Sequence, residues 1–238
     1  MTNYWDKRFL DKINHEPKII FEVGARYGDE SIYLSQLFKN SQIYSFECNP
    51  NTIEICKNKL EKYKNINFIG KGLGDKNTNL PFYSYIKNND GASSFYKRID
   101  GDTTQEITGY IEITKISDIM NHYNLENIDL LCMDVQGFEL NVLKGAEKYL
   151  EKVNYIIMEE PNPIINLKEL PKNTYSKYIN SPTPNEIKEF MIKNNFSEIV
   201  RIPENEIEHN VMYKNKKLDV NLIKKKHNPL RKISMYFN

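Results

Sequence analysis

Three carboxylates accompany short apolar runs that are typical of buried strands. They are Glu22, near the end of residues 19–23, Glu47, directly after residues 42–46, and Asp134, directly after residues 128–133. Each acid alone is explained better by an exposed strand end or a helix cap. In an open parallel sheet, however, ligands bind beyond the carboxyl ends of the strands, where all three acids would meet. Their repetition at matching strand ends therefore favours one shared binding site.

A turn with two glycines follows the first run, and Ala25 lies in it between Gly24 and Gly28. Glycine lets the backbone approach a ligand closely, and the unpaired N–H groups of a helix predicted at residues 31–38 face the same spot. The turn lacks the middle glycine of the dinucleotide fingerprint, and the chain has no G-K-[ST] sequence of a P-loop. These features favour a nucleoside that carries a small charged group in place of a pyrophosphate.

S-adenosylmethionine is a cofactor of that kind. Glu47 lies roughly 20–25 residues beyond the glycines, where such folds place the acid that holds ribose hydroxyls. Glu22 would then bind the methionine amine, and the methionyl group would lie over Gly24. The spacing of the motifs therefore predicts S-adenosylmethionine at this edge of the sheet.

The elements that must hold these residues alternate between strands and helices. We predict strands at residues 19–23, 42–46, 67–69, 80–85, 110–113, 128–133, 153–158, 196–201 and 210–214. We predict helices at residues 3–14, 31–38, 50–63, 116–123, 138–150 and 186–194. This alternation predicts an α/β fold with a mostly parallel central sheet and helices on both faces. The pattern fails over residues 162–184, where we expect an excursion over the active-site face.

Four segments resemble motifs of the FkbM family of class I S-adenosylmethionine-dependent methyltransferases. Residues 22–28 are similar to its first motif, and residues 46–50 are similar to its ribose-binding F-E-P-N-P. Residues 91–94 are similar to its G-x-S-S loop. Residues 133–146 are similar to its I-D-V-[EQ]-G-x-E…V-L-x-G-A. The last likeness is the most specific. Glu22 stands where many members have Asp, and Cys48 replaces the usual proline. The resemblance covers roughly residues 17–214.

The resemblance implies a Rossmann-like class I methyltransferase domain at residues 17–214, after a helical extension at residues 1–16 and before a basic tail at residues 215–238. It also implies methyl transfer, usually to a hydroxyl oxygen of a sugar, a glycan precursor or another small metabolite. Methyltransferases that act on base amino groups carry an N/D-P-P-Y-type motif after the fourth strand. Residues 134–137 of this chain read D-V-Q-G at that position, which disfavours base methylation.

The motifs assign expected roles to particular side chains. We expect cofactor contacts from Glu22, Gly24, Ala25, Gly28, Glu47, Cys48, Gly72 and Asp134, and substrate contacts from Ser93, Ser94, Gln136 and Glu139. Asp134 is the leading candidate for orienting or deprotonating the acceptor hydroxyl, ahead of Glu139 and Glu159. Glu139 is explained equally well as a first-turn helix acid, and the two serines as hydroxyls that satisfy loop backbone. Asp134, Glu159 and Glu160 offer oxygen ligands to a divalent metal, but no spacing favours a metal site.

The composition and charge of the chain argue against several other classes of function. A net charge of +1 gives no global reason to expect nucleic acid as a partner. No apolar run approaches the ~20 residues of a membrane helix, and the N-terminus has no apolar signal-peptide core. We therefore expect a cytoplasmic protein whose three cysteines stay reduced. No sequence feature indicates an oligomeric state.

Two other functions stay open on the sequence. From Lys214 onward the chain carries eight Lys or Arg residues against the single acid Asp219. Such a tail could mark an enzyme that methylates RNA ribose, although a solvated or disordered end explains such runs more often. The chain could also be a non-catalytic module that keeps the fold to bind a partner.

Overall fold

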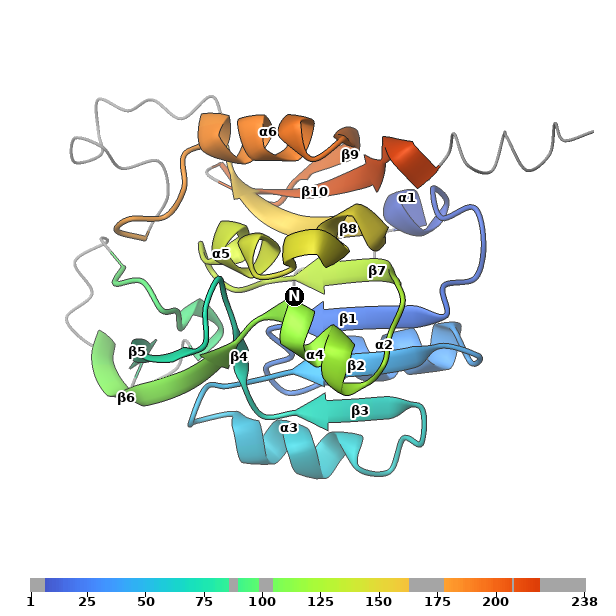
Figure 1. The fold of residues 1–238 in the computed structure, drawn as a ribbon. Coiled ribbons are helices and arrows are strands. Elements are labelled where there is room, and N and C mark those ends of the chain that lie inside the picture. The colour runs from blue at the N-terminus through green and yellow to red at the C-terminus, as the bar shows by residue number, and fades with distance from the viewer. Residues whose placement is uncertain (1–6, 86–89, 99–104, 163–177, 207, 219–238) are drawn as a thin grey trace, which may run out of the picture.

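The computed structural model describes residues 7–85, 90–98, 105–162, 178–206 and 208–218 (Figure 1). Seven strands form the main sheet in the spatial order β3-β2-β1-β7-β8-β10-β9. Their bounds are β1 (Ile19–Val23), β2 (Gln42–Phe46), β3 (Ile66–Ile69), β7 (Ile128–Met133), β8 (Val153–Pro161), β9 (Phe196–Pro203) and β10 (Glu208–Asn215). The strands share one direction except β10, which is antiparallel to both its neighbours. The predicted, mostly parallel sheet is confirmed.

Helices cover both faces of this sheet because successive strand residues point to opposite cores. The helices are α1 (Lys7–Leu10), α2 (Asp29–Leu37), α3 (Ile53–Leu60), α4 (Ile116–His122), α5 (Glu139–Lys144) and α6 (Pro184–Lys193). In β1, Phe21 and Val23 share a core with residues of α4, α5 and α6, whereas Ile20 shares a second core with residues of α1 and α2. Burial on both sides explains why the strands are continuous apolar runs.

A second sheet lies beyond the carboxyl ends of the parallel strands (Figure 1). It contains β4 (Gly72–Leu73), β5 (Thr78–Tyr85) and β6 (Gln105–Thr114) in the order β4-β6-β5. The strands predicted at residues 80–85 and 110–113 belong to this small sheet. The ring of Phe95 lies 4.9 Å from that of Phe82 and 5.0 Å from that of Phe138, between centroids. These rings hold the segment after β5 against the start of α5.

The single helix predicted over residues 138–150 is wrong. Helix α5 ends at Lys144, and a short 3-10 helix, η2 (Glu147–Lys152), follows. Gly145 packs so closely on the turn after β4 that a Cβ there would lie 2.0 Å from the carbonyl oxygen of Gly74. Glu147 then takes a positive φ of 50°, which an α-helix does not contain. The helix therefore stops where its backbone meets the small sheet.

Several sequence-based expectations fall at the edges of the described chain. Helix α1 is shorter than the helix predicted at residues 3–14, of which residues 1–6 lie outside the described part. Residues 163–177 of the predicted excursion and residues 219–238 of the basic tail also lie outside it. The excursion returns at Tyr178, which forms an antiparallel bridge with Arg98. Within the described ranges, no helix is long and apolar enough to cross a membrane.

Candidate active site

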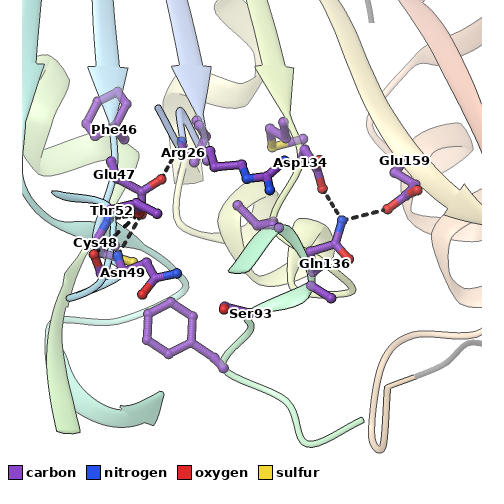
Figure 2. Close-up of a pocket in the computed structure, with 18 of the residues that line it drawn as sticks. Arg26, Phe46, Glu47, Cys48, Asn49, Thr52, Ser93, Asp134, Gln136 and Glu159 are labelled. Carbon is purple, nitrogen blue, oxygen red and sulfur yellow. Dashed lines mark hydrogen bonds between the residues drawn. The ribbon is translucent and has the colours of Figure 1, made fainter. Parts of the chain in front are cut away.

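A cavity of about 410 Å³ opens at the carboxyl ends of β1, β2, β7 and β8 (Figure 2). The segment between β5 and β6 contributes further lining residues. The cavity is lined by many of the residues predicted for the site, namely Glu22, Gly24, Glu47, Cys48, Gly72, Ser93, Asp134, Gln136 and Glu159. Four other predicted residues, Ala25, Gly28, Ser94 and Glu139, lie outside the lining. The three strand-end acids therefore meet at one cavity.

The turn after β1 lies between the ends of β2 and β7 and contacts the backbone of both. The N–H groups of Gly24 and Ala25 both donate to the carbonyl oxygen of Phe46, each at 2.9 Å. Gly24 has a φ of +93°, and a Cβ on it would lie 2.0 Å from the backbone oxygen of Asp134. A residue with a side chain does not fit such an approach, so this part of the cavity wall is bare backbone.

Ala25 and Gly28 shape the turn from behind the cavity. Ala25 is fully buried against Cys56 and Leu60 of α3. Gly28 has a φ of +78° and begins α2, where a Cβ would lie 2.7 Å from a methyl carbon of Leu60. Both residues therefore act on the site through packing of the glycine turn against α3.

Glu47 is held by the backbone around it. One carboxylate oxygen accepts the N–H groups of Cys48 at 2.8 Å and Asn49 at 2.6 Å, and the other accepts the N–H of Arg26 at 2.5 Å. Burial raises the pKa of this carboxyl to about 7, although the N–H donors oppose the rise. The side chain of Thr52 also hydrogen-bonds to this carboxyl, so four donors from the chain hold it in place. Figure 2 shows this group at one end of the cavity.

Glu22 borders the cavity from within the core. Its Oε2 accepts hydrogen bonds from Ser31 of α2 at 2.6 Å and from Ser45 of β2 at 3.1 Å. Burial raises the pKa of the Glu22 carboxyl to about 8, more than the two hydroxyls lower it. The group is therefore largely protonated near neutral pH until a cation approaches it.

Gln136 connects the two candidate catalytic acids. Its Nε2 donates to Oδ1 of Asp134 at 2.5 Å and to Oε2 of Glu159 at 3.2 Å (Figure 2). Its Oε1 accepts a hydrogen bond from the hydroxyl of Tyr178, which also lies 3.2 Å from the carbonyl oxygen of Ala92. Because the amide has one donor end and one acceptor end, Tyr178 orients the donor end toward both acids.

Glu159 belongs to a group of carboxylates at the other end of the cavity from Glu47. Burial raises its pKa well above the usual value, and the charges of Asp134, Glu208 and Glu204 raise it further. Glu204 follows β9 and Glu208 begins β10, and both line the cavity. The C-terminal strands therefore add acids that the sequence motifs did not identify.

The four predicted substrate residues divide into two kinds. Ser93 and Gln136 reach the cavity, and the hydroxyl of Ser93 has no hydrogen-bond partner among the described residues. Ser94 donates to the carbonyl oxygen of Gln136 at 2.8 Å and so joins two loops. Glu139 is 3% exposed and accepts the N–H groups of Val135 at 3.1 Å and Gly137 at 3.3 Å. Its contacts are those of a first-turn helix acid.

Other lining residues were missed in the sequence. Arg26 donates through Nε to Asp90 at 2.9 Å, and Asp90 also accepts the hydroxyl of Tyr27. This ion pair joins the glycine turn to the segment after β5, across the cavity. The G-x-S-S likeness directly after Asp90 could have drawn attention to it. Tyr178 lies outside the lining but bonds to Gln136, and it carries no motif because it follows a proline-rich segment without periodicity.

The buried carboxyls predict a pH dependence of stability. Burial raises the pKa of Glu22 and of Glu139 from 4.5 to about 8, so each binds its proton more tightly in the folded chain than in the unfolded chain. Their stabilisation is complete below about pH 4.5 and is lost as the pH rises toward 8. We expect the free energy of unfolding to fall by at least about 1.4 kcal/mol between about pH 5 and about pH 8. Urea unfolding at both pH values measures this fall.

Two variants test whether the fall in the free energy of unfolding comes from the buried carboxyls of the site. Glu22→Gln removes one titrating group and keeps an amide that can bond to Ser31 and Ser45, so its fall should be smaller. Glu189→Gln changes an exposed acid of α6 and should behave as the parent does. A free energy of unfolding that is constant or rises over this range contradicts the proposed protonation.

Metal ligands do not gather at this site in the described part of the chain. No group of three or more His, Cys, Asp or Glu side chains is arranged there to hold a metal ion. The carboxylates of Asp134 and Glu159 instead share one neutral amide. Glu160, the third acid considered for a metal, accepts hydrogen bonds from Arg201 at 2.9 Å and from Tyr213.

The sheet and the cavity together define a protein class. A seven-stranded sheet with one antiparallel strand, a glycine turn after β1 and an acid after β2 are the fold of a class I S-adenosylmethionine-dependent methyltransferase. The chain belongs to the FkbM methyltransferase family, because the family profile described as the methyltransferase FkbM domain matches residues 22–198. The resemblance seen in the sequence is confirmed, and with it the enzyme class and the cofactor.

Individual relatives are distant. The chain is 23% identical to the 2-O-methyltransferase NoeI of Sinorhizobium fredii and 27% identical to the methyltransferase sdnD of Sordaria araneosa. The matches span 64% and 60% of this chain, and 67% and 66% of those relatives, which is about two thirds of their length. Fibrillarin of Aeropyrum pernix, solved with bound S-adenosylmethionine, matches 84% of this chain and 67% of its own, with 13% identity and a TM-score of 0.48.

Proposed function

We propose that this protein methylates a hydroxyl oxygen of a small acceptor, a sugar or a glycan precursor. The observation that carries the proposal is the pair of carboxylates, Asp134 and Glu159, held on the cavity wall by the single amide of Gln136. Such a pair can orient a hydroxyl and receive its proton. The printed name of NoeI, a 2-O-methyltransferase, supports oxygen as the accepting atom.

The residues of the cavity fit the cofactor. Gly24 presents backbone to the cavity, where the methionyl group would lie, and Glu47 lies at the end of the cavity where it can meet a ribose hydroxyl. Glu22 borders the cavity near that turn, where the ammonium group of the cofactor would favour its charged form. When bound, S-adenosylmethionine supplies a methyl group on a sulfonium that is already a good leaving group.

The chain itself must position the acceptor and manage one proton. Asp134 lies at the end of β7 and orients or deprotonates the hydroxyl, while Gln136 fixes the direction of its carboxylate. Positioning can supply ~7–11 kcal/mol, and a general base contributes typically 10²–10⁴-fold. Because a 10²–10⁴-fold effect is about 3–5 kcal/mol, geometry is expected to contribute more than the base.

The charge of the cavity supports a small acceptor over RNA. Eight acidic side chains line it, namely Glu22, Glu30, Glu47, Asp90, Asp134, Glu159, Glu204 and Glu208, against the three basic side chains Arg26, Lys71 and Arg98. Nucleic-acid affinity comes mainly from basic contacts with phosphates. An acidic lining disfavours a phosphate backbone beside the reacting atom, so the RNA alternative loses support.

The cofactor role is tested by calorimetry with S-adenosylhomocysteine. Glu47→Ala should weaken binding by about ten- to a hundredfold, because a hydrogen bond to a charged group contributes ~1.5–3 kcal/mol. The exposed acid of α3 provides a control, and Glu54→Ala should bind as the parent does. Circular dichroism establishes that both variants are folded. Unchanged affinity in Glu47→Ala would remove the ribose role.

Turnover separates the enzyme from a non-catalytic module. The full chain, incubated with methyl-labelled S-adenosylmethionine and a panel of sugars and sugar nucleotides, should transfer label to at least one acceptor. Binding of S-adenosylhomocysteine without transfer to any acceptor would favour the module. Affinity for RNA that falls steeply with salt, together with label in ribose, would favour the RNA alternative.

A further inference from the structure

A short segment after β5 bounds the cavity on the side that faces the glycine turn. We call residues 90–95 the strap, and all of them except Ser94 line the cavity. The buried hydroxyl of Ser93 has no hydrogen-bond partner among the described residues. A buried polar group left unpaired is unfavourable, so this hydroxyl indicates that the strap meets a ligand in the cavity.

The two ends of the strap are held in different ways. At the carboxyl end, the backbone of Ser94 exchanges two hydrogen bonds with that of Tyr83, at 2.9 and 3.0 Å. Phe95 is 9% exposed, and its ring lies against the rings of Phe82 and Phe138. Because these contacts are paired backbone and buried rings, the carboxyl end is fixed to β5 and to the start of α5.

The amino end of the strap is held by a contact of opposite charges. Asp90 accepts hydrogen bonds from Nε of Arg26 at 2.9 Å and from the hydroxyl of Tyr27. The guanidinium of Arg26 lies so near Gly91 that a Cβ on this glycine would be 3.0 Å from Cζ. The Arg26 side chain is 50% exposed, and exposed ion pairs contribute little stability and are screened by salt. The amino end can therefore open while the carboxyl end stays in place.

This ion pair lies directly beside the predicted ribose acid. Arg26 follows the fully buried Ala25 in the glycine turn, and its N–H donates to Oε2 of Glu47 at 2.5 Å. In the view of Figure 2, the Arg26 side chain lies between Glu47 and Asp134. Arg26 thus contacts the ribose acid through its backbone and the strap through its side chain. A cofactor bound at Glu47 would lie next to the contact between Arg26 and Asp90.

We propose that the ion pair of Arg26 and Asp90 is a clasp, which closes the strap over S-adenosylmethionine and opens to release the product. Closure of this kind keeps water from the reacting atoms, and its opening can limit the rate of product release. The fixed carboxyl end keeps Ser93 near the cavity in both states. This inference rests on the proposed position of the cofactor beside Gly24 and Glu47.

The exchange rates of S-adenosylhomocysteine distinguish a clasp from an ordinary cofactor contact. The full chain is loaded with tritium-labelled S-adenosylhomocysteine and chased with unlabelled ligand, and association is followed by rapid mixing and filtration. A clasp that closes the free and the loaded protein alike slows entry and exit to the same degree. In Asp90→Asn we therefore expect both rates to rise at least about fivefold, with a Kd within about twofold of the parent.

Salt gives a second measure of the same contact. S-adenosylhomocysteine has no net charge at neutral pH, so salt acts on the ion pair more than on the ligand. Raising the salt concentration should speed dissociation from the parent protein, because it screens the exposed ion pair. The effect should be smaller in Asp90→Asn, in which the ion pair is already absent.

Further variants assign the effect to this ion pair. Arg26→Gln removes the other partner and should raise both rates as Asp90→Asn does, and the double variant should exceed the single ones by no more than about twofold. Asp29→Asn breaks the ion pair of Asp29 with Lys59, which lies outside the cavity lining, and should keep the parent rates. Circular dichroism establishes that each variant is folded.

Two results would overturn the clasp. Exchange rates that stay at parent values in both Asp90→Asn and Arg26→Gln would mean that the strap does not limit exchange. Faster dissociation with unchanged association would raise the Kd and make Asp90 an ordinary cofactor contact. A parent protein that fails to bind S-adenosylhomocysteine, or binds it independently of Glu47, contradicts the proposed cofactor site itself. That failure is recognised before any variant of the strap is measured.

Discussion

Replacing Asp134 with asparagine is expected to lower kcat by about 10²–10⁴-fold, the usual contribution of a general base. The amide keeps the size of the side chain but loses the charge that receives the hydroxyl proton. Because we propose that the cofactor binds beside Gly24 and Glu47, the affinity for S-adenosylhomocysteine should change by less than about threefold. Single-turnover methyl transfer and calorimetry on the same preparation measure the two quantities.

A control variant shows whether this result is specific to Asp134. Asp75→Asn changes an exposed acid in the turn after β4 and should leave kcat and affinity at parent values. Parallel losses of kcat and S-adenosylhomocysteine affinity in Asp134→Asn would instead assign Asp134 to the cofactor site. A kcat within about threefold of the parent would mean that positioning alone carries the reaction.

Gly24→Ala is expected to have the largest effect on folding. The added methyl group would lie 2.0 Å from the backbone oxygen of Asp134, at a φ of +93° that alanine rarely adopts. The contact cannot be relieved by rotating a side chain, because the oxygen of Asp134 belongs to the backbone. We expect the free energy of unfolding to fall by about 3 kcal/mol or more, with binding of S-adenosylhomocysteine lost in any folded fraction. Urea unfolding followed by circular dichroism measures the loss.

Gly70→Ala is the matched control for this variant. Gly70 follows β3, and the nearest atom to its added methyl group would be a terminal carbon of Ile53, 3.1 Å away, which can move. Its free energy of unfolding should stay within about 1 kcal/mol of the parent. A Gly24→Ala protein as stable as this control would contradict the close approach of β1 and β7.

Much of the fold could be predicted from the sequence because burial on both sheet faces leaves a strong pattern. The runs at residues 19–23, 42–46 and 128–133 correspond to strands with those same bounds. Parallel pairing then brings their carboxyl ends together, which is why the sequence predicts that Glu22, Glu47 and Asp134 are neighbours. The elements that differ are those governed by contacts distant in sequence, such as the break after α5 at Gly145.

Side-chain roles were less predictable than side-chain positions. A glutamate five residues beyond the strand-end Asp134 could face either the cavity or the first turn of a helix, and Glu139 bonds to that turn. Glu204 and Glu208 lie around a hairpin between β9 and β10 and carry no motif, so only the fold brings them to the cavity. Periodicity describes which face a residue occupies on its own element, but it holds no information about loops that meet across a site.

The bond between Tyr178 and Gln136 matters to anyone who recombines members of this family to change acceptor preference. An obvious chimera would exchange the stretch between β8 and α6, and Tyr178 would leave with it. Without that hydroxyl, the amide of Gln136 is free to turn over and present its oxygen to Asp134 and Glu159. The chimera would then be inactive because its own acids had lost their alignment, and it would be misjudged as a failure to accommodate the new acceptor. Retaining the tyrosine in such exchanges separates the two causes.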